Sequence, residues 1–95
     1  MKSTKIEVDK ISDGEFQVRV IEGPSATSHR VTVKPSDVKR FASGNTDPIL
    51  LIRLSFEFLL ENEPKESILP RFDLSVIPRY FPSYERQIRR RLAAC

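Results

Sequence analysis

The most constraining feature of the sequence is an apolar segment between Asp47 and Asn62 that is too wide for one face of a surface helix. Asp47 followed by Pro48 is typical of an N-cap and a first helical position, and Glu63-Pro64 marks the end of the segment. At about 100° of rotation per residue, apolar side chains cover most of the circumference. They are Ile49, Leu51, Ile52, Leu54, Phe56, Phe58, Leu59 and Leu60. The sequence therefore predicts a central helix over 47–62 that needs cover on more than one side.

Only a narrow polar ridge interrupts this helix, formed by Arg53, Glu57 and Glu61 at fourfold spacing. We expect a sheet against one apolar face and the later helices against another. An alternative is that a second copy of the chain covers the surplus apolar face and forms a homodimer.

The first third of the chain alternates between apolar and polar residues, as half-buried strands do. A two-residue turn at Asp13-Gly14 would mix the apolar side of one strand with the charged side of the next. A three-residue loop over 12–14, with Gly14 in the left-handed conformation, instead pairs Val8 with Val18 and Ile6 with Val20. The sequence thus predicts a bulged hairpin.

The next connection, around residues 23–27, is expected to be a longer loop that sets Val20 near Val31 and Val18 near Val33. One face of the resulting sheet is aliphatic. The other face is expected to meet solvent or a partner, and it carries Glu7, Asp9, Gln17, Arg19, Ile21, Arg30 and Thr32.

After Val33 the spacing of apolar residues indicates helices. A short connector helix is expected from Pro35, with Phe41 on its apolar face and Gly44 as its terminator. Residues 65–70 are expected to form a turn or a single helical turn, and Asp73 to cap a short helix that Pro78 truncates or kinks. The core residues expected in this region are Phe72, Val76, Ile77, Tyr80 and Phe81.

Pro82 and Ser83 open the last helix, in which Tyr84, Ile88 and Leu92 form one apolar stripe. The predicted fold class is α+β, as a single domain over 1–95. It consists of a three-stranded antiparallel β-meander within 5–34 and a helical part over 35–95, with a short connector helix, a buried central helix and C-terminal helices.

The chain offers little that is typical of an active site. One histidine, His29, and one cysteine, Cys95, provide no metal-ligand set, and the three glycines form no phosphate-binding loop. His29 is expected at the rim of the core. The only polar groups that remain as candidates for catalysis are His29, Asp73 and Ser75, and they form no recognised catalytic motif. We therefore expect no enzyme, no cofactor and no small-molecule ligand. A lone cysteine and the absence of an apolar run long enough for a signal peptide or a membrane span favour a cytoplasmic protein.

Residues 56–69 with 72–82, which include the strings FEFLL, EPKESIL, FDLSVI and RYFP, resemble a segment found in small uncharacterised bacterial and archaeal proteins. The resemblance covers roughly a third of the chain. It implies a small microbial domain and carries with it no activity, cofactor or partner.

The most suggestive surface feature is basic. Residues 79–95 contain five arginines against the single acid Glu85, and contacts to a nucleic acid or an acidic partner are expected from Arg79, Arg86, Arg89 and Arg90. These arginines could instead pair with Glu57, Glu61, Glu63 and Glu66. The leading hypothesis is a non-enzymatic protein-interaction module acting through a charged helical surface or the open sheet face. Nucleic-acid binding by the last helix is the alternative.

Overall fold

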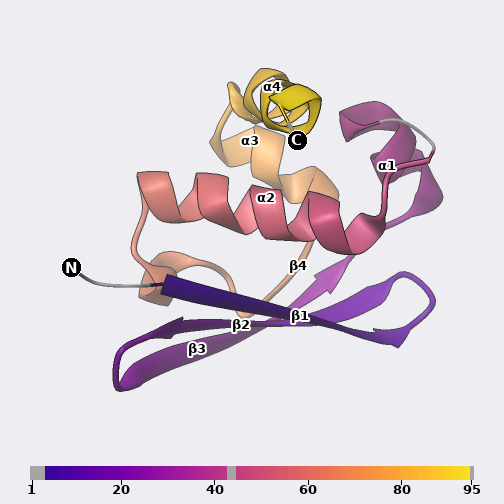
Figure 1. Ribbon diagram of the computed structural model, residues 1–95. Coiled ribbons are helices and arrows are strands. Elements are labelled where there is room, and N and C mark those ends of the chain that lie inside the picture. The colour runs from indigo at the N-terminus through magenta and orange to yellow at the C-terminus, as the bar shows by residue number, and fades with distance from the viewer. Residues whose placement is uncertain (1–3, 43–44, 95) are drawn as a thin grey trace.

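The computed structural model describes residues 4–42 and 45–94 and has the predicted α+β fold, with a sheet on one side and helices on the other (Figure 1). The strands are β1 (Thr4–Ser12), β2 (Glu15–Glu22), β3 (Ser25–Thr32) and β4 (Arg71–Asp73). The helices are α1 (Pro35–Phe41), α2 (Pro48–Asn62), α3 (Ile77–Tyr80) and α4 (Tyr84–Ala94). Two 3-10 turns, η1 (Lys65–Ser67) and η2 (Leu74–Val76), flank β4.

The first hairpin has the predicted bulge and register. Val8 pairs with Val18 and Ile6 with Val20, and the register shifts between Lys10 and Ser12. Gly14 adopts a φ of +77°, and a Cβ there would lie 3.2 Å from the carbonyl oxygen of Val33. The left-handed conformation therefore favours glycine at this turn, and the close approach of another backbone segment adds to that preference.

The prediction for the second hairpin is wrong in its register. Val20 pairs with Thr27 and Val18 with His29, which displaces β3 by four residues from the expected alignment. The cause is a two-residue turn at Gly23-Pro24 in place of a longer loop. Gly23 has a φ of +58°, while the proline ring fixes a negative φ at the next position, as a type II′ turn requires. An even displacement leaves the same side chains facing the core.

The sheet has a fourth strand that the sequence pattern does not predict. β4 pairs in parallel with β3 and places Phe72 beside Val31, giving the strand order β1-β2-β3-β4. The backbone N–H of Arg30 donates to the carbonyl oxygen of Pro70 at 2.8 Å, which extends the pairing by one bond. This short strand brings η1, η2 and α3 to the edge of the sheet next to β3.

The central helix is confirmed. The Asp47 carboxylate caps α2 by accepting from the backbone N–H of Ile49 at 2.9 Å. Phe56 faces the sheet, with its ring centroid 5.4 Å from that of His29, while Phe58 faces the opposite layer and lies 5.5 Å from Tyr84. Figure 1 shows α2 running across the sheet, with α3 and α4 on its far side.

Two residues of the polar ridge of α2 connect this helix to its neighbours, one to the sheet and one to α4. Arg53 donates from Nη1 to the carbonyl oxygen of Ile6 at 2.6 Å, on the outer edge of β1. At the other end of the helix, Glu61 accepts from Arg91 of α4 at 2.5 Å. The hydrogen bond from Arg53 satisfies the carbonyl group of Ile6, which has no neighbouring strand at this edge of the sheet.

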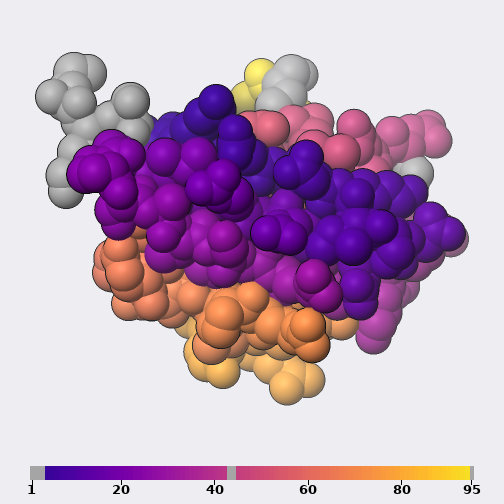
Figure 2. Space-filling view, turned by 90° about the horizontal axis from the view of Figure 1, so that it is seen from below, coloured from indigo at the N-terminus to yellow at the C-terminus, as the bar shows by residue number. Residues whose placement is uncertain are grey.

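The other face of the sheet is open. In Figure 2, which views the molecule from below, the strands form the near surface and no helix crosses them. Its charged side chains are partly paired, since Glu7 lies 3.5 Å from Lys5 and 3.9 Å from Arg19. Exposed pairs of this kind contribute little to stability, about 0–1 kcal/mol each.

The remaining helical predictions are mostly confirmed. α1 ends at Phe41, and Gly44, its expected terminator, lies outside the described residues. Asp73 is the expected N-cap and accepts from the backbone N–H of Ser75 at 3.1 Å, but the helix it begins is divided into η2 and α3. Pro78 lies in the first turn of α3, where its missing N–H has no cost. Cys95 also lies outside the described residues.

Candidate functional site

The last helix is held by a buried tyrosine. Tyr84 and Ile88 are fully buried, and the Tyr84 ring lies 5.1 Å from that of Phe41. Ser55 on α2 donates its only hydroxyl proton to the carbonyl oxygen of Leu51 at 2.7 Å, so the Tyr84 hydroxyl must donate to Ser55 Oγ, also at 2.7 Å. Burial raises the pKa of Tyr84 well above its ordinary value, and the hydroxyl keeps the proton that it donates.

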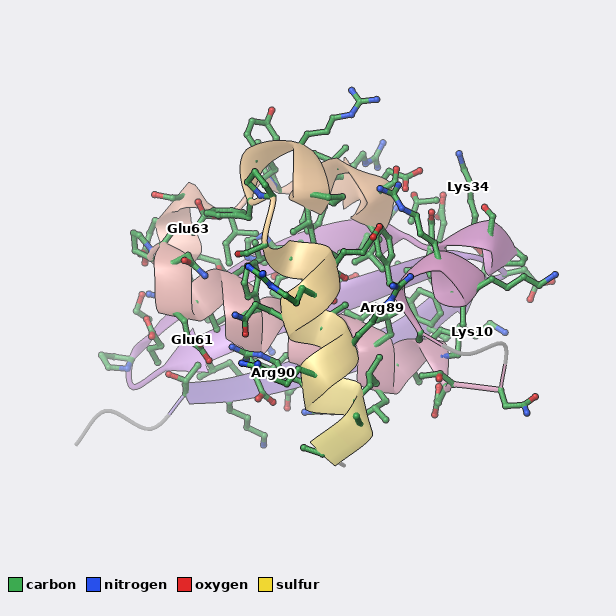
Figure 3. The ribbon with its side chains drawn as sticks, turned by 90° about the horizontal axis from the view of Figure 1, so that it is seen from above. Lys10, Lys34, Glu61, Glu63, Arg89 and Arg90 are labelled. Atoms are coloured by element: carbon green, nitrogen blue, oxygen red, sulfur yellow. The ribbon has the colours of Figure 1, made fainter. Side chains whose placement is uncertain are left out.

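The structure does not gather the predicted arginines into one free cluster. Arg89 donates from Nη2 to the carbonyl oxygen of Arg40 at 2.5 Å and thereby ties α4 to the end of α1. Arg79, Arg86 and Arg90 are exposed, and within residues 4–42 and 45–94 none of them makes an ion pair. Figure 3 shows Arg89 and Arg90 on opposite sides of α4.

The glutamates expected to pair with these arginines, Glu57, Glu61, Glu63 and Glu66, differ in their partners. Glu61 pairs with Arg91, whose hydrogen bond holds the pKa of Glu61 below its ordinary value. Glu66 pairs with Lys65, and Glu57 acts on Arg91 only through its charge. Glu63 has no side-chain partner in the part of the chain that the structure describes.

Lys65 is a buried cation that no pattern in the sequence indicates. Its side chain is 5% exposed, and its ammonium lies 3.2 Å from Glu22 Oε1 and also contacts Glu66. The hydrogen bond to Glu66 raises the pKa of Lys65. This arrangement attaches η1 to the end of β2, and it compensates the charge that would otherwise be buried alone.

The three residues considered for catalysis are not brought together. His29 lies inside the core and not at its rim, being 3% exposed, with Nδ1 2.8 Å from the carbonyl oxygen of Leu69 and Nε2 2.8 Å from Thr27 Oγ1. Asp73 points to the opposite face of the sheet, where it binds Ser75 and lies 3.5 Å from the Lys34 ammonium. A carbonyl oxygen only accepts, so the Nδ1 of His29 carries a proton.

An apolar pocket of about 370 Å³, which we call the α2–α3 pocket, lies where the end of α2 meets η1, β4 and α3. It is lined by Leu59, Glu63, Ser67, Ile68, Leu69, Phe72, Val76, Ile77, Tyr80 and Phe81. Its volume falls in the range typical of ligand pockets, about 300–1,000 Å³. The floor is core, because Leu59, Ile68 and Ile77 are buried.

Two side chains on the walls of this pocket are unusual. Leu69 is 44% exposed and Tyr80 is 68% exposed, and they account for two of the three large apolar side chains exposed in the described residues. The third is Ile11, 44% exposed, at the bulge of β1. The predicted core position of Tyr80 is therefore wrong and that of Ile77 is confirmed, because the four-residue helix α3 buries Ile77 and ends at Tyr80.

Glu63 is the only charged residue among those that line the pocket. It is the C-cap of α2, where the backbone already presents partial negative charge, and α2 has no basic residue in its last turn. Burial raises the pKa of Glu63 above its ordinary value. The carboxylate is therefore poorly compensated in a mainly apolar wall.

A second hollow, of about 750 Å³, lies between the first hairpin and α1 and is bordered by Lys10, Lys34 and Lys39. Two of these lysines already have acidic partners, since Lys10 lies 3.2 Å from Asp13 and Lys34 pairs with Asp73. Figure 3 shows Lys10 and Lys34 at the end of the molecule opposite to Glu63. The mixed charge makes this hollow a weaker candidate than the α2–α3 pocket.

Comparison with known proteins does not assign the chain to a family, because no family model, no curated protein and no solved structure matches it. Among the described residues, no group of histidine, cysteine or carboxylate side chains is arranged to hold a metal ion. The described helices are also too short or too polar to cross a bilayer.

Proposed function

We propose that this protein is a non-enzymatic protein-interaction module that docks a partner polypeptide in the α2–α3 pocket. The observation that carries the proposal is the exposure of Leu69 and Tyr80 on the walls of one apolar hollow. Full burial of a large apolar side chain contributes about 1.5–3 kcal/mol, and Leu69 and Tyr80 forgo part of this gain, so their concentration at one place favours a site that is covered on binding.

A polypeptide partner suits this surface better than a small molecule does. The pocket can receive one large side chain as a buried anchor, while Leu69 and Tyr80 extend the apolar surface beyond its mouth. Protein interfaces commonly have this form, with an anchor in a pocket and a surrounding rim that excludes water.

Peptide selection tests the proposal. A phage-displayed library of random 12-residue peptides, selected on the immobilised domain, should yield binders that share a large apolar residue. Leu69→Ser combined with Tyr80→Ser should weaken those binders at least about tenfold, because each substitution removes apolar contact area of the kind that contributes 1.5–3 kcal/mol when buried. Isothermal titration calorimetry measures the affinities.

Ile11→Ser is the matched control, since Ile11 has the same 44% exposure as Leu69 and lies outside the pocket. It should leave binding unchanged, and thermal unfolding should show all variants folded, because the substituted side chains are exposed. Peptides that bind the double variant as tightly as the original protein would overturn the proposal. A selection that enriches no peptide would also count against it.

Nucleic-acid binding is a second candidate, favoured by the exposed Arg79, Arg86 and Arg90 that lack ion-pair partners within the described residues. Arginines in this state are available to phosphates, and each phosphate contact makes the affinity more dependent on salt. Arg89 is better left unchanged in a test, because its guanidinium is bonded to the end of α1.

If this second function operates, Arg86→Gln with Arg90→Gln should weaken binding to labelled single- or double-stranded oligonucleotides and reduce the salt slope by up to about two. Fluorescence anisotropy at two salt concentrations measures both quantities. The control is Lys5→Gln with Arg71→Gln, which makes the same change in charge on the open face of the sheet. Equal effects of the two pairs would indicate attraction by net charge alone and contradict a site on α4.

A further inference from the structure

The α2–α3 pocket contains a single charge, and its sign indicates what the partner carries. Glu63 lines the pocket together with apolar side chains and two hydroxyl-bearing residues, Ser67 and Tyr80. It has no side-chain partner among residues 4–42 and 45–94. A carboxylate beside apolar walls gains more from a nearby cation than one in open water does, because water screens it less.

The protein's own cations do not meet this carboxylate. Lys65, two positions along the chain, is held between Glu22 and Glu66. Arg91 is paired with Glu61 on the side of α2 that faces α4. Arg79 precedes the pocket residue Tyr80 but makes no ion pair within the described part of the chain. Among the described residues, therefore, no cation compensates the charge of Glu63.

The rest of the pocket suits an organic cation. Phe72, Tyr80 and Phe81 place three aromatic rings in its walls, and aromatic rings attract ammonium and guanidinium groups through their electron-rich faces. The C-terminal end of α2 adds the partial negative charge of the helix dipole, and no basic residue of its last turn offsets it. These features all favour positive charge at the same rim.

We infer that the α2–α3 pocket recognises a partner segment in which a large apolar residue, inserted into the pocket, has a lysine or arginine next to it that pairs with Glu63. This inference rests on the proposed docking function and specifies its ligand. The apolar residue supplies most of the affinity, while the cation supplies selectivity against neutral and acidic segments.

Three capped peptides of the form SG-X-F-X-GS, with X as lysine, glutamine or glutamate on both sides of the phenylalanine, test the inference. The symmetric flanks make the result independent of chain direction. We expect the lysine peptide to bind about three- to tenfold more tightly than the glutamine peptide, the range for a partly exposed charged contact, and the glutamate peptide to bind least. Nuclear magnetic resonance titration of the full chain measures these affinities.

Glu63→Gln should make the lysine and glutamine peptides bind equally, because the lysine peptide then has no carboxylate in the pocket to pair with. Glu61→Gln is the matched control, because it removes the same charge two residues away on the paired glutamate, and it should keep the preference for lysine. A lysine preference that survives Glu63→Gln overturns the inference.

The outcomes separate this inference from the docking function. If the glutamine peptide binds and Leu69→Ser with Tyr80→Ser abolishes its binding, yet lysine brings no gain, the inference fails and the docking function stands. If no peptide binds, both fail. Binding of phenethylammonium without binding of any peptide would also overturn both, since it would indicate a pocket for small amines.

Discussion

Replacing Tyr84 with alanine is expected to destabilise the protein by about 3–5 kcal/mol, the usual cost of removing a large buried aromatic side chain. Tyr84 is fully buried, contacts the rings of Phe41 and Phe58, and hydrogen-bonds to Ser55. A chain of 95 residues has a free energy of unfolding of about 5–15 kcal/mol. We therefore expect Tm to fall by roughly 12–40 °C, measured by circular dichroism.

Tyr84→Phe separates the contribution of the hydroxyl group to stability from that of the ring. It keeps the packing against Phe41 and Phe58 but removes the proton that Tyr84 donates to Ser55. The expected cost is about 1–2 kcal/mol, because a buried hydroxyl oxygen loses a partner. If alanine and phenylalanine at this position cost the same, α4 would not be held to α2 by ring packing, and the described arrangement of these two helices would be wrong.

Phe56→Ala is expected to have an effect of similar size in the other half of the core, about 3–5 kcal/mol. Phe56 is fully buried where α2 meets the sheet, and its ring lies 5.4 Å from that of His29 and 6.0 Å from that of Phe72. Loss of this ring leaves a cavity between α2 and the strands β3 and β4. Urea unfolding followed by fluorescence of the tyrosines measures the change.

Phe56→Leu is the corresponding control and should cost less than about half as much, because a leucine refills most of the volume. An alanine variant as stable as the original protein would contradict the placement of Phe56 between the layers. A further check is that Glu57→Ala, at the exposed neighbouring position, should change stability by no more than about 0.5 kcal/mol.

Local patterns were sufficient to predict most of the helices and one hairpin. Asp47 and Pro48 mark the start of α2, and the parity of Val8 and Val18 with the glycine at position 14 determines the first register. The second register could not be obtained in this way, because two alignments that differ by four residues present the same apolar face. The choice between them rests on the turn formed by Gly23 and Pro24.

The fourth strand could not be predicted from the local sequence pattern, for a different reason. Residues 71–73 are too few to show an alternation, and their pairing with β3 depends on where α2 and η1 deliver the chain. The exposure of Tyr80 has a local cause, the short length of α3. A tyrosine among apolar neighbours is expected in a core, yet the short α3 buries Ile77 and leaves Tyr80 at the surface.

The candidate site was only partly accessible from the sequence. The composition of α4 indicates a basic surface, and all four expected arginines are exposed without ion pairs among the described residues, although Arg89 is hydrogen-bonded to the carbonyl oxygen of Arg40. The α2–α3 pocket combines residues from α2, η1, β4, η2 and α3, so no single segment reveals it. The one usable signal was Leu69, an apolar residue directly before Pro70 in a segment expected to be a turn.

The most direct test of the central claim is a ¹³C-methyl spectrum of the domain titrated with the tightest selected peptide. Docking in the α2–α3 pocket predicts that the largest changes in chemical shift occur at the methyl groups of Ile68, Leu69, Val76 and Ile77, with Ile11 unchanged. Changes concentrated at Leu92 on α4 or at Ile21 on the open face of the sheet, with the pocket methyl groups unmoved, would contradict it.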